Sequence, residues 1–379
     1  MLRLLLSKPE NISCSICGKS SERISKAMGV CIECIRTKPE ESWAKAKNAH
    51  IRSRKRFDLP PSPPQNEEGV KCKICANACE IPINEKGFCG LRINKKGSLK
   101  HLGGTPSRGI LEWYHDPLPT NCVADWVCPA GTGCGYPKYS YTNGEPEYGY
   151  NNLAVFYGAC TFDCLFCQNW HYKLLTKNLL PMMSADELAS QVNENTSCIC
   201  YFGGDPTAQL PHAIKTSEIA MERNKDRILR ICWESNGTMT PSYLKKVAEI
   251  SMKSGGCIKI DLKAWDEYLN LALCGASNKQ TKKNIELLAN YGRQRKEFPF
   301  LVVSTLLVPG YVDVVEIENI AKFLFSLDPE IPYSLLAFHP QFEMEDMPTT
   351  SQKEAYECYN KAKSAGLKNV RIGNVHLLA

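Results

Sequence analysis

Short apolar runs alternate with amphipathic segments from residue 151 to the C-terminus. Continuous apolar runs without polar alternation are typical of buried strands in a parallel sheet, and helical crossovers must connect such strands. The intervening segments have helical periodicity, and one opens with a serine and a glutamate at capping-box spacing. The apolar runs span 153–158, 198–204, 228–235, 257–263, 300–310 and 333–340, and the predicted helices include 184–195, 241–252 and 313–326. We expect an α/β fold of about six βα units, which is enough for a partial (β/α)6 barrel.

The residues before 151 lack this pattern and divide into three segments. Residues 1–45 contain two Cys-x2-Cys knuckles, residues 46–66 are basic and end in a proline-rich run, and residues 67–150 are rich in Cys, Gly and Pro. Proline favours extended chain, so we expect 46–66 to be a solvated linker, although its basic side chains could instead contact an acidic partner. The predicted domains are these three segments and a core domain over 151–379.

Composition narrows the class of protein. The chain has 379 residues, 43% of them hydrophobic, a net charge of +6 and 20 cysteines. The charge is modest and spread along the chain, so we expect no nucleic-acid partner. The N-terminal run MLRLLL is too short for a signal-peptide core, and no apolar stretch reaches the ~18 residues of a membrane helix. Half of the cysteines lie at Cys-x2-Cys or Cys-x3-Cys spacing, which is typical of metal sites, and we expect a cytoplasmic protein.

The two N-terminal knuckles predict a zinc ribbon. Cys14 and Cys17 form the first knuckle, and Cys31 and Cys34 form the second. Four thiolates suit a closed tetrahedral Zn²⁺, and so short a segment has too little core to fold without the metal. The alternatives are a rubredoxin-like iron and a docking site for a partner.

A second set of four cysteines follows the linker. Cys72, Cys75, Cys79 and Cys89 have a spacing that suits either zinc or iron. A later Gly- and Pro-rich stretch holds three thiols that could supply ligands to an iron–sulfur cluster: Cys122, Cys128 and Cys134. The other cysteines fall mostly inside apolar runs, where a free thiol behaves as a small hydrophobe, and we assign them to packing. They are Cys198, Cys200, Cys232, Cys257, Cys274 and Cys358.

The first apolar run leads into GACTFDCLFCQNW, which places Cys160, Cys164 and Cys167 on one loop. In a parallel α/β sheet this loop lies at the carboxyl edge, where such folds place their ligand sites. Three thiolates can hold three irons of a cubane cluster, and the local run offers no fourth cysteine, so one iron is left open. His171 could in principle bind that iron, but a nearby histidine is more often a packing or hydrogen-bonding residue.

The spacing Cys160-x3-Cys164-x2-Cys167, with Phe166 before the last cysteine, resembles the signature loop of the radical S-adenosylmethionine (SAM) superfamily. The resemblance implies a [4Fe-4S] cluster whose open iron binds the amino and carboxylate groups of SAM, with the aromatic residue near the adenine. It also implies reductive cleavage of SAM to methionine and a 5'-deoxyadenosyl radical, so that the cofactor supplies the chemistry and the protein positions it.

Two later strand ends resemble SAM-binding segments of the same superfamily. Gly203, Gly204 and Asp205 resemble the motif that receives the methionine amino group, in which the glycines permit backbone approach and the carboxylate accepts a hydrogen bond. Ser235 and Asn236 resemble the segment that contacts the ribose or methionine. The alternative for the glycines is an ordinary turn at the end of a strand.

Two further strand ends imply residues that face SAM or substrate. Asp261 and Lys263 resemble the Asp-x-Lys motif of glycyl-radical-enzyme activases, and alternate residues of a strand share a face, so we name them as catalytic candidates. His339 follows the last apolar run at the same edge of the sheet, and we include it among the cofactor-binding candidates.

Residues 70–379 resemble the activase-like group called AmmeMemoRadiSam, relatives of pyruvate formate-lyase activating enzyme, in segments such as FGGDPT, IDLKAW and AFHPQFEMEDMPTT. The resemblance implies hydrogen abstraction from a residue of a protein or peptide substrate, with ferredoxin or flavodoxin as reductant. One alternative is cobalamin-dependent C-methylation of a protein residue, for example in methyl-coenzyme M reductase. The other is a non-enzymatic iron–sulfur electron carrier, which would not cleave SAM.

Overall fold

A sheet with seven parallel strands forms the centre of the molecule. The computed structural model describes residues 10–379; the first nine, on which the signal-peptide prediction rests, lie outside the described residues. The α/β fold is confirmed, and the sheet has one parallel strand more than the predicted apolar runs, because the last strand is short and only partly buried. The parallel strands are β8 (Asn151–Tyr157), β10 (Thr196–Gly203), β11 (Arg230–Ser235), β12 (Ile258–Asp261), β13 (Leu301–Leu307), β14 (Tyr333–Ala337) and β15 (Val370–Gly373), adjacent in that order.

An antiparallel strand from the predicted accessory region completes the sheet beside β8. This strand, β7 (Gly109–Pro117), pairs with β8 along seven residue pairs, and β9 (Met182–Met183) pairs with its first two residues. After its third residue β7 alternates exposed and half-buried positions and carries Glu112, His115 and Asp116, so it contains no long apolar run. The domain boundary predicted at residue 150 therefore crosses the core sheet.

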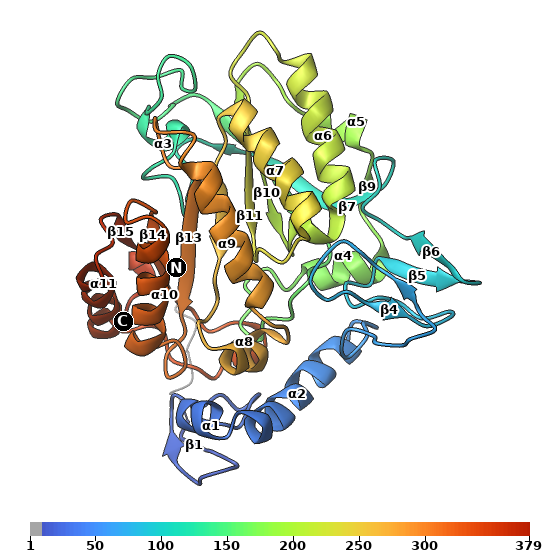
Figure 1. Cartoon of the computed structure of the whole chain (residues 1–379), viewed down its shortest axis with the longest axis vertical. Helices are drawn as coiled ribbons and strands as arrows, with labels where there is room; N and C mark the ends of the chain where they lie inside the picture. The colour runs from blue at the N-terminus through green and yellow to red at the C-terminus, as the bar shows by residue number, and fades with distance from the viewer. Residues whose placement is uncertain (1–9) are drawn as a thin grey trace, which may run out of the picture.

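Helices connect the parallel strands and cover the outer face of the sheet, as Figure 1 shows. The predicted capping box is present at the start of α5, where Ser184 and Glu187 each accept a hydrogen bond from the other's backbone N–H. This helix is shorter than predicted, because Asn193 and Thr196 bond local backbone groups and compete with the helix. The helices are α4 (Tyr172–Asn178), α5 (Ala185–Ala189), α6 (Leu210–Arg223), α7 (Pro241–Ser254), α8 (Glu267–Cys274), α9 (Lys279–Gly292), α10 (Val314–Leu327) and α11 (Gln352–Ser364), with 3₁₀ turns η1 (Pro206–Gln209), η2 (Phe342–Met344) and η3 (Val375–Leu377).

The two faces of the parallel strands differ in chemistry. Ile199, Ile231 and Ile258 are fully buried in the main apolar core. Alternate residues of the same strands point to the other face, the interior of the barrel. Those interior residues carry sulfur or charge: Cys200, Cys232 and Lys259.

The first described residues cover the carboxyl edge of the barrel, at the bottom of Figure 1. A small hairpin of β1 (Ile12–Ser13) and β2 (Ser20–Ser21) is followed by α1 (Ile32–Thr37) and the long α2 (Pro39–Lys55). Both helices contact α8, which follows β12. The N-terminal module therefore packs directly on the loops that leave the parallel strands.

Helix α2 shows that the linker predicted over 46–66 is wrong for residues 46–55. Ala46, Ala49, His50 and Ser53 are at most 2% exposed and lie three or four positions apart, which places them on one face of the helix. The lysines of this segment occupy other positions on the helix. The basic composition therefore indicated a solvated linker although one face of the helix is buried.

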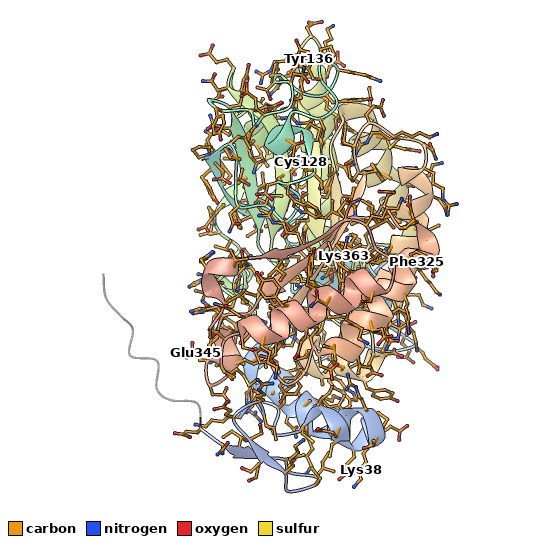
Figure 2. All side chains as sticks on the ribbon, turned by 90° about the vertical axis from the view of Figure 1, so that its left-hand side faces the viewer. Lys38, Cys128, Tyr136, Phe325, Glu345 and Lys363 are labelled. Atoms are coloured by element: carbon orange, nitrogen blue, oxygen red, sulfur yellow. The ribbon has the colours of Figure 1, made fainter. Side chains whose placement is uncertain are left out.

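The remaining segments before β8 lie at two different ends of the barrel. Two small hairpins sit beside the carboxyl edge, whereas α3 (Pro129–Thr132) lies at the amino edge. Figure 2 shows Cys128, just before α3, far from Lys38 of the N-terminal module. The hairpins are β3 (Val70–Lys71) with β4 (Glu80–Ile81), and β5 (Arg92–Lys95) with β6 (Ser98–His101). No helix among residues 10–379 combines the length and apolar character that crossing a bilayer requires.

Candidate functional site

One pocket at the carboxyl edge collects the segments that follow four neighbouring strands, β8, β10, β11 and β12. It encloses about 910 Å³ of space not filled by protein atoms, including the open solvent at its mouth. We call it the SAM pocket. Its lining includes every residue predicted for the cluster and for SAM except His339: Cys160, Cys164, Phe166, Cys167, Gly203, Gly204, Asp205, Ser235, Asn236, Asp261 and Lys263.

The cluster loop, residues 160–167, is fixed to the end of α8. The Asp163 N–H donates to the Cys274 carbonyl at 2.8 Å, and the Leu165 N–H donates to the Leu273 carbonyl at 2.9 Å. The Cys274 thiol lies beside Cys164, and its hydrogen bond is the largest contribution that lowers the pKa of Cys164. These contacts fix the middle of the loop and favour a thiolate at Cys164, the form that binds a metal.

The first cysteine of the loop is held from the opposite side. The Phe162 N–H points at Cys160 Sγ at 3.3 Å, and the Asn236 side-chain nitrogen lies 3.7 Å from the same sulfur. The Asn236 amide also donates to Thr161 Oγ1 at 2.8 Å. Asn236 is therefore directed at the cluster loop, so that its side chain orders the loop as well as lining the pocket.

A buried ionic network beneath the loop was missed by the sequence analysis. Asp163 is fully buried, and its carboxylate contacts Lys173, His50 at 3.0 Å and Arg54 at 3.5 Å. The other ring nitrogen of His50 lies 3.0 Å from the Ala272 carbonyl, so both nitrogens face acceptors. Burial alone would raise the pKa of Asp163, but the Lys173, His50 and Arg54 groups outweigh it and hold that pKa well below its usual range.

Arg54 connects this network to segments far along the chain. Its guanidinium lies 3.5 Å from the centre of the Phe88 ring and donates to the Phe88 and Pro60 carbonyls. Phe88 precedes Cys89 of the second predicted metal site. Helix α2 thus holds the cluster loop and the Cys-rich segment together through one side chain.

The spread of the three loop thiols fits a multi-iron cluster. Within residues 10–379, one set of ligand atoms converges within 4.8 Å, and it does not include Cys160, Cys164 or Cys167. A single ion with metal–sulfur bonds of about 2.3 Å needs its sulfurs about 3.8 Å apart. A cubane binds each thiolate to a different iron, which requires wider spacing. Three thiols that line one pocket without converging on a single ion are compatible with such a cluster.

Asp205 joins the two predicted SAM-binding segments. The Asn236 N–H donates to its carboxylate at 2.7 Å, the Ser235 hydroxyl at 3.0 Å and the Thr207 N–H at 2.8 Å. Burial raises the pKa of Asp205 although these hydrogen bonds favour the carboxylate. Three donors leave this carboxylate with acceptor capacity for one further group. The ends of β10 and β11 therefore form one hydrogen-bonded unit.

The two glycines before Asp205 are required by contacts within the protein. Gly203 has φ +105°, and a Cβ there would lie 2.3 Å from the Tyr157 nitrogen; a Cβ on Gly204 would lie 2.1 Å from the Ala159 carbonyl oxygen. No side chain fits at either position without moving backbone. The glycines thus permit a close approach of backbone, as expected, but the backbone that approaches them in the structure belongs to the end of β8 and the residues after it.

The predicted charged pair faces the same pocket. Lys263 contacts the Asp261 carboxylate, whose other oxygen accepts the Ser304 hydroxyl at 2.8 Å. Burial disfavours the Lys263 ammonium, but the adjacent Asp261 carboxylate outweighs it and raises the pKa of Lys263. The ammonium also lies 5.9 Å from the centre of the Phe166 ring. Lys263 therefore stays charged, and it lies beside the aromatic residue of the cluster loop.

Both histidines considered in the sequence analysis lie outside the pocket lining. The Nδ1 of His339 faces the Pro340 carbonyl at 2.9 Å. His171 is exposed and stacks on Trp170, with ring centres 4.0 Å apart. His171 therefore has the packing role that the sequence favoured. His339 is not among the residues that line the pocket, and its cofactor-binding role stays a prediction.

The N-terminal knuckles form a compact four-thiol site. Cys14 and Cys34 have sulfurs 3.7 Å apart, as do Cys17 and Cys31, and all four converge within 4.8 Å. This spacing matches the value of about 3.8 Å expected for tetrahedral bonds of about 2.3 Å to zinc. The geometry fits a single thiolate-bound ion, and zinc stays the prediction for its identity.

The second set of cysteines is arranged differently. Burial raises the pKa of Cys72, Cys75 and Cys79, and the neighbouring thiols of this set raise it further. The four cysteines are outside the set that converges within 4.8 Å. The segment docks on the cluster loop, where Asn77 donates to the Thr161 carbonyl at 2.8 Å. The choice between zinc and iron stays open.

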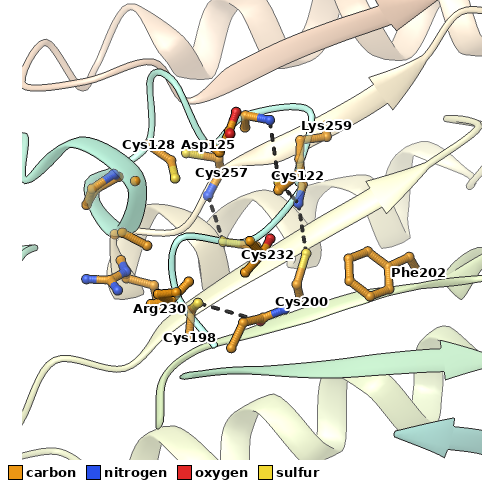
Figure 3. Close-up of a pocket in the computed structure, with 18 residues that line it drawn as sticks. Cys122, Asp125, Cys128, Cys198, Cys200, Phe202, Arg230, Cys232, Cys257 and Lys259 are labelled. Carbon is orange, nitrogen blue, oxygen red and sulfur yellow. Dashed lines mark hydrogen bonds between the residues drawn. The ribbon is translucent and has the colours of Figure 1, made fainter. Parts of the chain in front are cut away.

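Cys122 and Cys128 do not join this second set. They lie at the opposite end of the barrel, in a pocket that is also lined by four of the cysteines assigned to packing (Figure 3). The thiols of that pocket come from neighbouring strands and from the segment around α3. Their juxtaposition arises only when the parallel sheet forms.

The comparisons with known proteins agree with the geometry of the SAM pocket. Residues 154–324 match the model of the radical SAM superfamily. The match covers less than half of the chain, and over these residues it confirms the resemblance to this class of enzyme that the cluster loop carries. That class implies a [4Fe-4S] cluster and SAM.

Several known proteins are similar to the chain. It is 26% identical over 320 residues to an uncharacterised protein of Methanocaldococcus jannaschii, covering 82% of this chain and 83% of that protein. A second protein of that organism, provisionally named a glycyl-radical enzyme activating enzyme, is 34% identical over 186 residues, covering 48% of this chain and 64% of the relative. A solved domain of pyruvate-formate lyase-activating enzyme from Bacteroides vulgatus is 24% identical, covering 46% of this chain and 98% of that domain, with a TM-score of 0.37.

Proposed function

We propose that this protein cleaves SAM reductively at a [4Fe-4S] cluster on Cys160, Cys164 and Cys167 and then abstracts hydrogen from a residue of a protein substrate. The observation that carries the proposal is the convergence of the cluster loop with the ends of β10, β11 and β12 in one pocket. When bound, the cluster supplies the electron that splits SAM into methionine and a 5'-deoxyadenosyl radical.

The residues of the chain would position SAM rather than act on it as acids or bases. Asp205 is buried and organises the Ser235–Asn236 turn, and its remaining acceptor capacity suits the methionine ammonium. Phe166 lies on the cluster loop beside Lys263, where an aromatic face suits the adenine. Holding the ligand in one orientation is the main contribution that a protein makes to such chemistry.

The Asp261–Lys263 pair is proposed as the contact between SAM and the substrate. Lys263 is paired and 15% exposed, and the Asp261 side chain is 22% exposed, so both retain a polar surface toward the pocket. The substrate class, a protein or peptide, is supported by the provisional name of the relative that is 34% identical. A low-potential reductant such as ferredoxin or flavodoxin would supply the electron.

The test is anaerobic reconstitution of the full chain with iron and sulfide, followed by SAM and a reductant. We expect 5'-deoxyadenosine from the wild type, none from Cys164→Ala, and a yield within twofold of wild type from the control Cys358→Ser, whose buried thiol lies in α11 away from the SAM pocket. Lys263→Met should lower the yield at least tenfold, whereas Lys215→Met, at an exposed ion pair, should not.

The products separate the candidate reactions. 5'-Deoxyadenosine alone supports hydrogen abstraction. S-Adenosylhomocysteine formed alongside it, together with a corrinoid spectrum, would replace the proposal with cobalamin-dependent methylation. No 5'-deoxyadenosine from a fully loaded cluster, and no SAM-dependent change in its electron paramagnetic resonance signal, would overturn SAM cleavage and leave the electron-carrier alternative.

A further inference from the structure

Six cysteines line a second pocket, inside the barrel toward the amino ends of the parallel strands (Figure 3). We call it the cysteine chamber. Its cavity measures about 40 Å³, several times the roughly 10–15 Å³ that one water occupies by the same measure. The thiols belong to β10, β11, the residue before β12 and the segment that closes the barrel: Cys122, Cys128, Cys198, Cys200, Cys232 and Cys257.

The cysteine chamber lies directly beneath the SAM pocket. Phe202 lines both cavities, and Lys259 of the chamber pairs at 3.5 Å with Glu234 of the SAM pocket. Cys200 and Cys232 are partners in adjacent parallel strands, each three residues before the end of its strand. At about 3.3 Å per residue, these sulfurs lie roughly 10 Å below the carboxyl edge.

The hydrogen bonds divide the chamber thiols into two groups. Cys198 donates to Asn152 Oδ1 at 3.5 Å, and Cys257 donates to the Pro299 carbonyl at 3.2 Å, so both thiols are directed at protein acceptors. Within residues 10–379 the other four thiols donate no hydrogen bond to a protein oxygen. Those four are Cys122, Cys128, Cys200 and Cys232.

Three of these four thiols instead accept hydrogen bonds, and the fourth, Cys128, lines the same pocket. The Lys259 ammonium lies 2.8 Å from Cys200 Sγ and 3.1 Å from Cys122 Sγ. Backbone N–H groups point at Cys122 at 3.4 Å and at Cys232 at 3.5 Å. Burial raises the pKa of Cys122 and Cys200, and the Lys259 ammonium opposes that effect. An ammonium and backbone N–H groups directed at sulfur are contacts that stabilise negative charge on the sulfurs of a metal cluster.

The charge balance also calls for an anion in the chamber. Lys259 is 2% exposed, and its one carboxylate neighbour among the described residues, Glu234, is at 3.5 Å and 29% exposed. The other chamber cation, Arg230, is already neutralised by a close pair with Glu147. A buried ammonium is costly without a buried negative partner. Thiolates carrying a metal cluster would supply that negative charge.

We propose that the cysteine chamber binds a second iron–sulfur cluster through Cys122, Cys128, Cys200 and Cys232. Four cysteine ligands are the ordinary set for such a cluster. A single ion is disfavoured, because within residues 10–379 no three of these sulfurs converge within 4.8 Å. The proposal goes beyond SAM cleavage and adds a redox centre beneath the SAM pocket, on the side away from the N-terminal module.

The test compares the anaerobically reconstituted full chain with the variant Cys128→Ser/Cys232→Ser and the matched control Cys358→Ser. We expect the double variant to lose about four irons and four sulfides per chain for a cubane, and the control to lose none. The SAM-dependent change in the resonance signal of the other cluster should persist in the double variant. That readout keeps a failure of this proposal distinct from a failure of SAM cleavage.

Iron anomalous scattering from crystals of the wild type tests the site without any substitution. An iron peak enclosed by the four sulfurs would support the cluster even where the double variant fails to fold. Wild-type iron content in a folded double variant would overturn the proposal. So would an anomalous map with zinc, or with no metal, in the cysteine chamber.

Discussion

Replacing Asp163 by asparagine should destabilise the protein more than any single change in the SAM pocket. The substitution keeps the size of the side chain and removes the negative charge that Lys173, Arg54 and His50 share, and each of these side chains is at most 2% exposed. Removing one partner of a buried ion pair costs about 3–5 kcal/mol, because the remaining charge stays buried and unpaired. Arg54 keeps two carbonyl acceptors, so Lys173 accounts for most of this loss.

The assay is urea unfolding of the iron-loaded protein under anaerobic conditions, followed by tryptophan fluorescence and by cluster absorbance. We expect Asp163→Asn to lower the free energy of unfolding by about 3–5 kcal/mol without a change in m-value. The double variant Asp163→Asn/Lys173→Met should regain at least half of this loss, since it buries no unpaired ammonium. The control Glu218→Gln breaks an ion pair whose side chains are 56% and 49% exposed, and we expect a change of about 0–1 kcal/mol.

The same carboxylate defines a pH dependence. Because the folded-state pKa of Asp163 is depressed, its contribution is complete above the unfolded value of about 3.9 and is lost as pH falls below it. Asp163→Asn should therefore be less acid-sensitive than the wild type below about pH 4. A loss under about 1 kcal/mol at pH 7 in Asp163→Asn would refute the reasoning, since it would mean that the cations are not held by this carboxylate.

Three further outcomes are expected. Cys31→Ser should release one metal ion per chain, measured by mass spectrometry of the native protein, and should expose α1 and α2 to amide exchange, because the knuckles have little core of their own. Gly203→Ala should cost about 1–3 kcal/mol of stability in urea unfolding and weaken SAM binding in calorimetry, because φ +105° and the Tyr157 backbone exclude a Cβ. His212 is buried, and burial lowers its pKa to about 4, so the wild type should lose about 2 kcal/mol between pH 7 and pH 5 as the unfolded state takes up a proton. In His212→Gln that part of the slope should be absent.

The pattern of apolar residues predicted the parallel strands, and it missed elements whose positions depend on contacts with residues far away in the sequence. The six apolar runs correspond to β8 and β10 to β14, because continuous apolar strands are typical of a parallel sheet. Strand β7 has alternating exposure, and its position beside β8 is set by pairing that no local pattern encodes. Helix α2 was taken for a linker because its charged residues outnumber the small residues of its buried face.

The SAM pocket was predictable because each of its motifs follows its own strand, and parallel strands bring their carboxyl ends to one edge. His339 follows the same rule but lies outside the pocket lining. The cysteine chamber was missed because its four thiols from the apolar runs were assigned to packing, while Cys122 and Cys128 were considered as ligands beside the second set of cysteines. The alternation of Cys198 with Cys200, and of Cys257 with Lys259, would have placed them on one interior face.

The segments before β8 are part of the construction of the active site rather than appendages to it. On one side, the cluster loop accepts a hydrogen bond from Asn77 of the Cys-rich segment. On the other side, the Asp163 carboxylate of the loop contacts His50 and Arg54 of α2. Each of these contacts is buried or partly buried, and together they restrain the loop that carries Cys160, Cys164 and Cys167. A site that must hold a cluster and SAM in one geometry needs rigid support around its ligands. In this protein much of that support comes from residues 50–77, which precede the residues that match the radical SAM model.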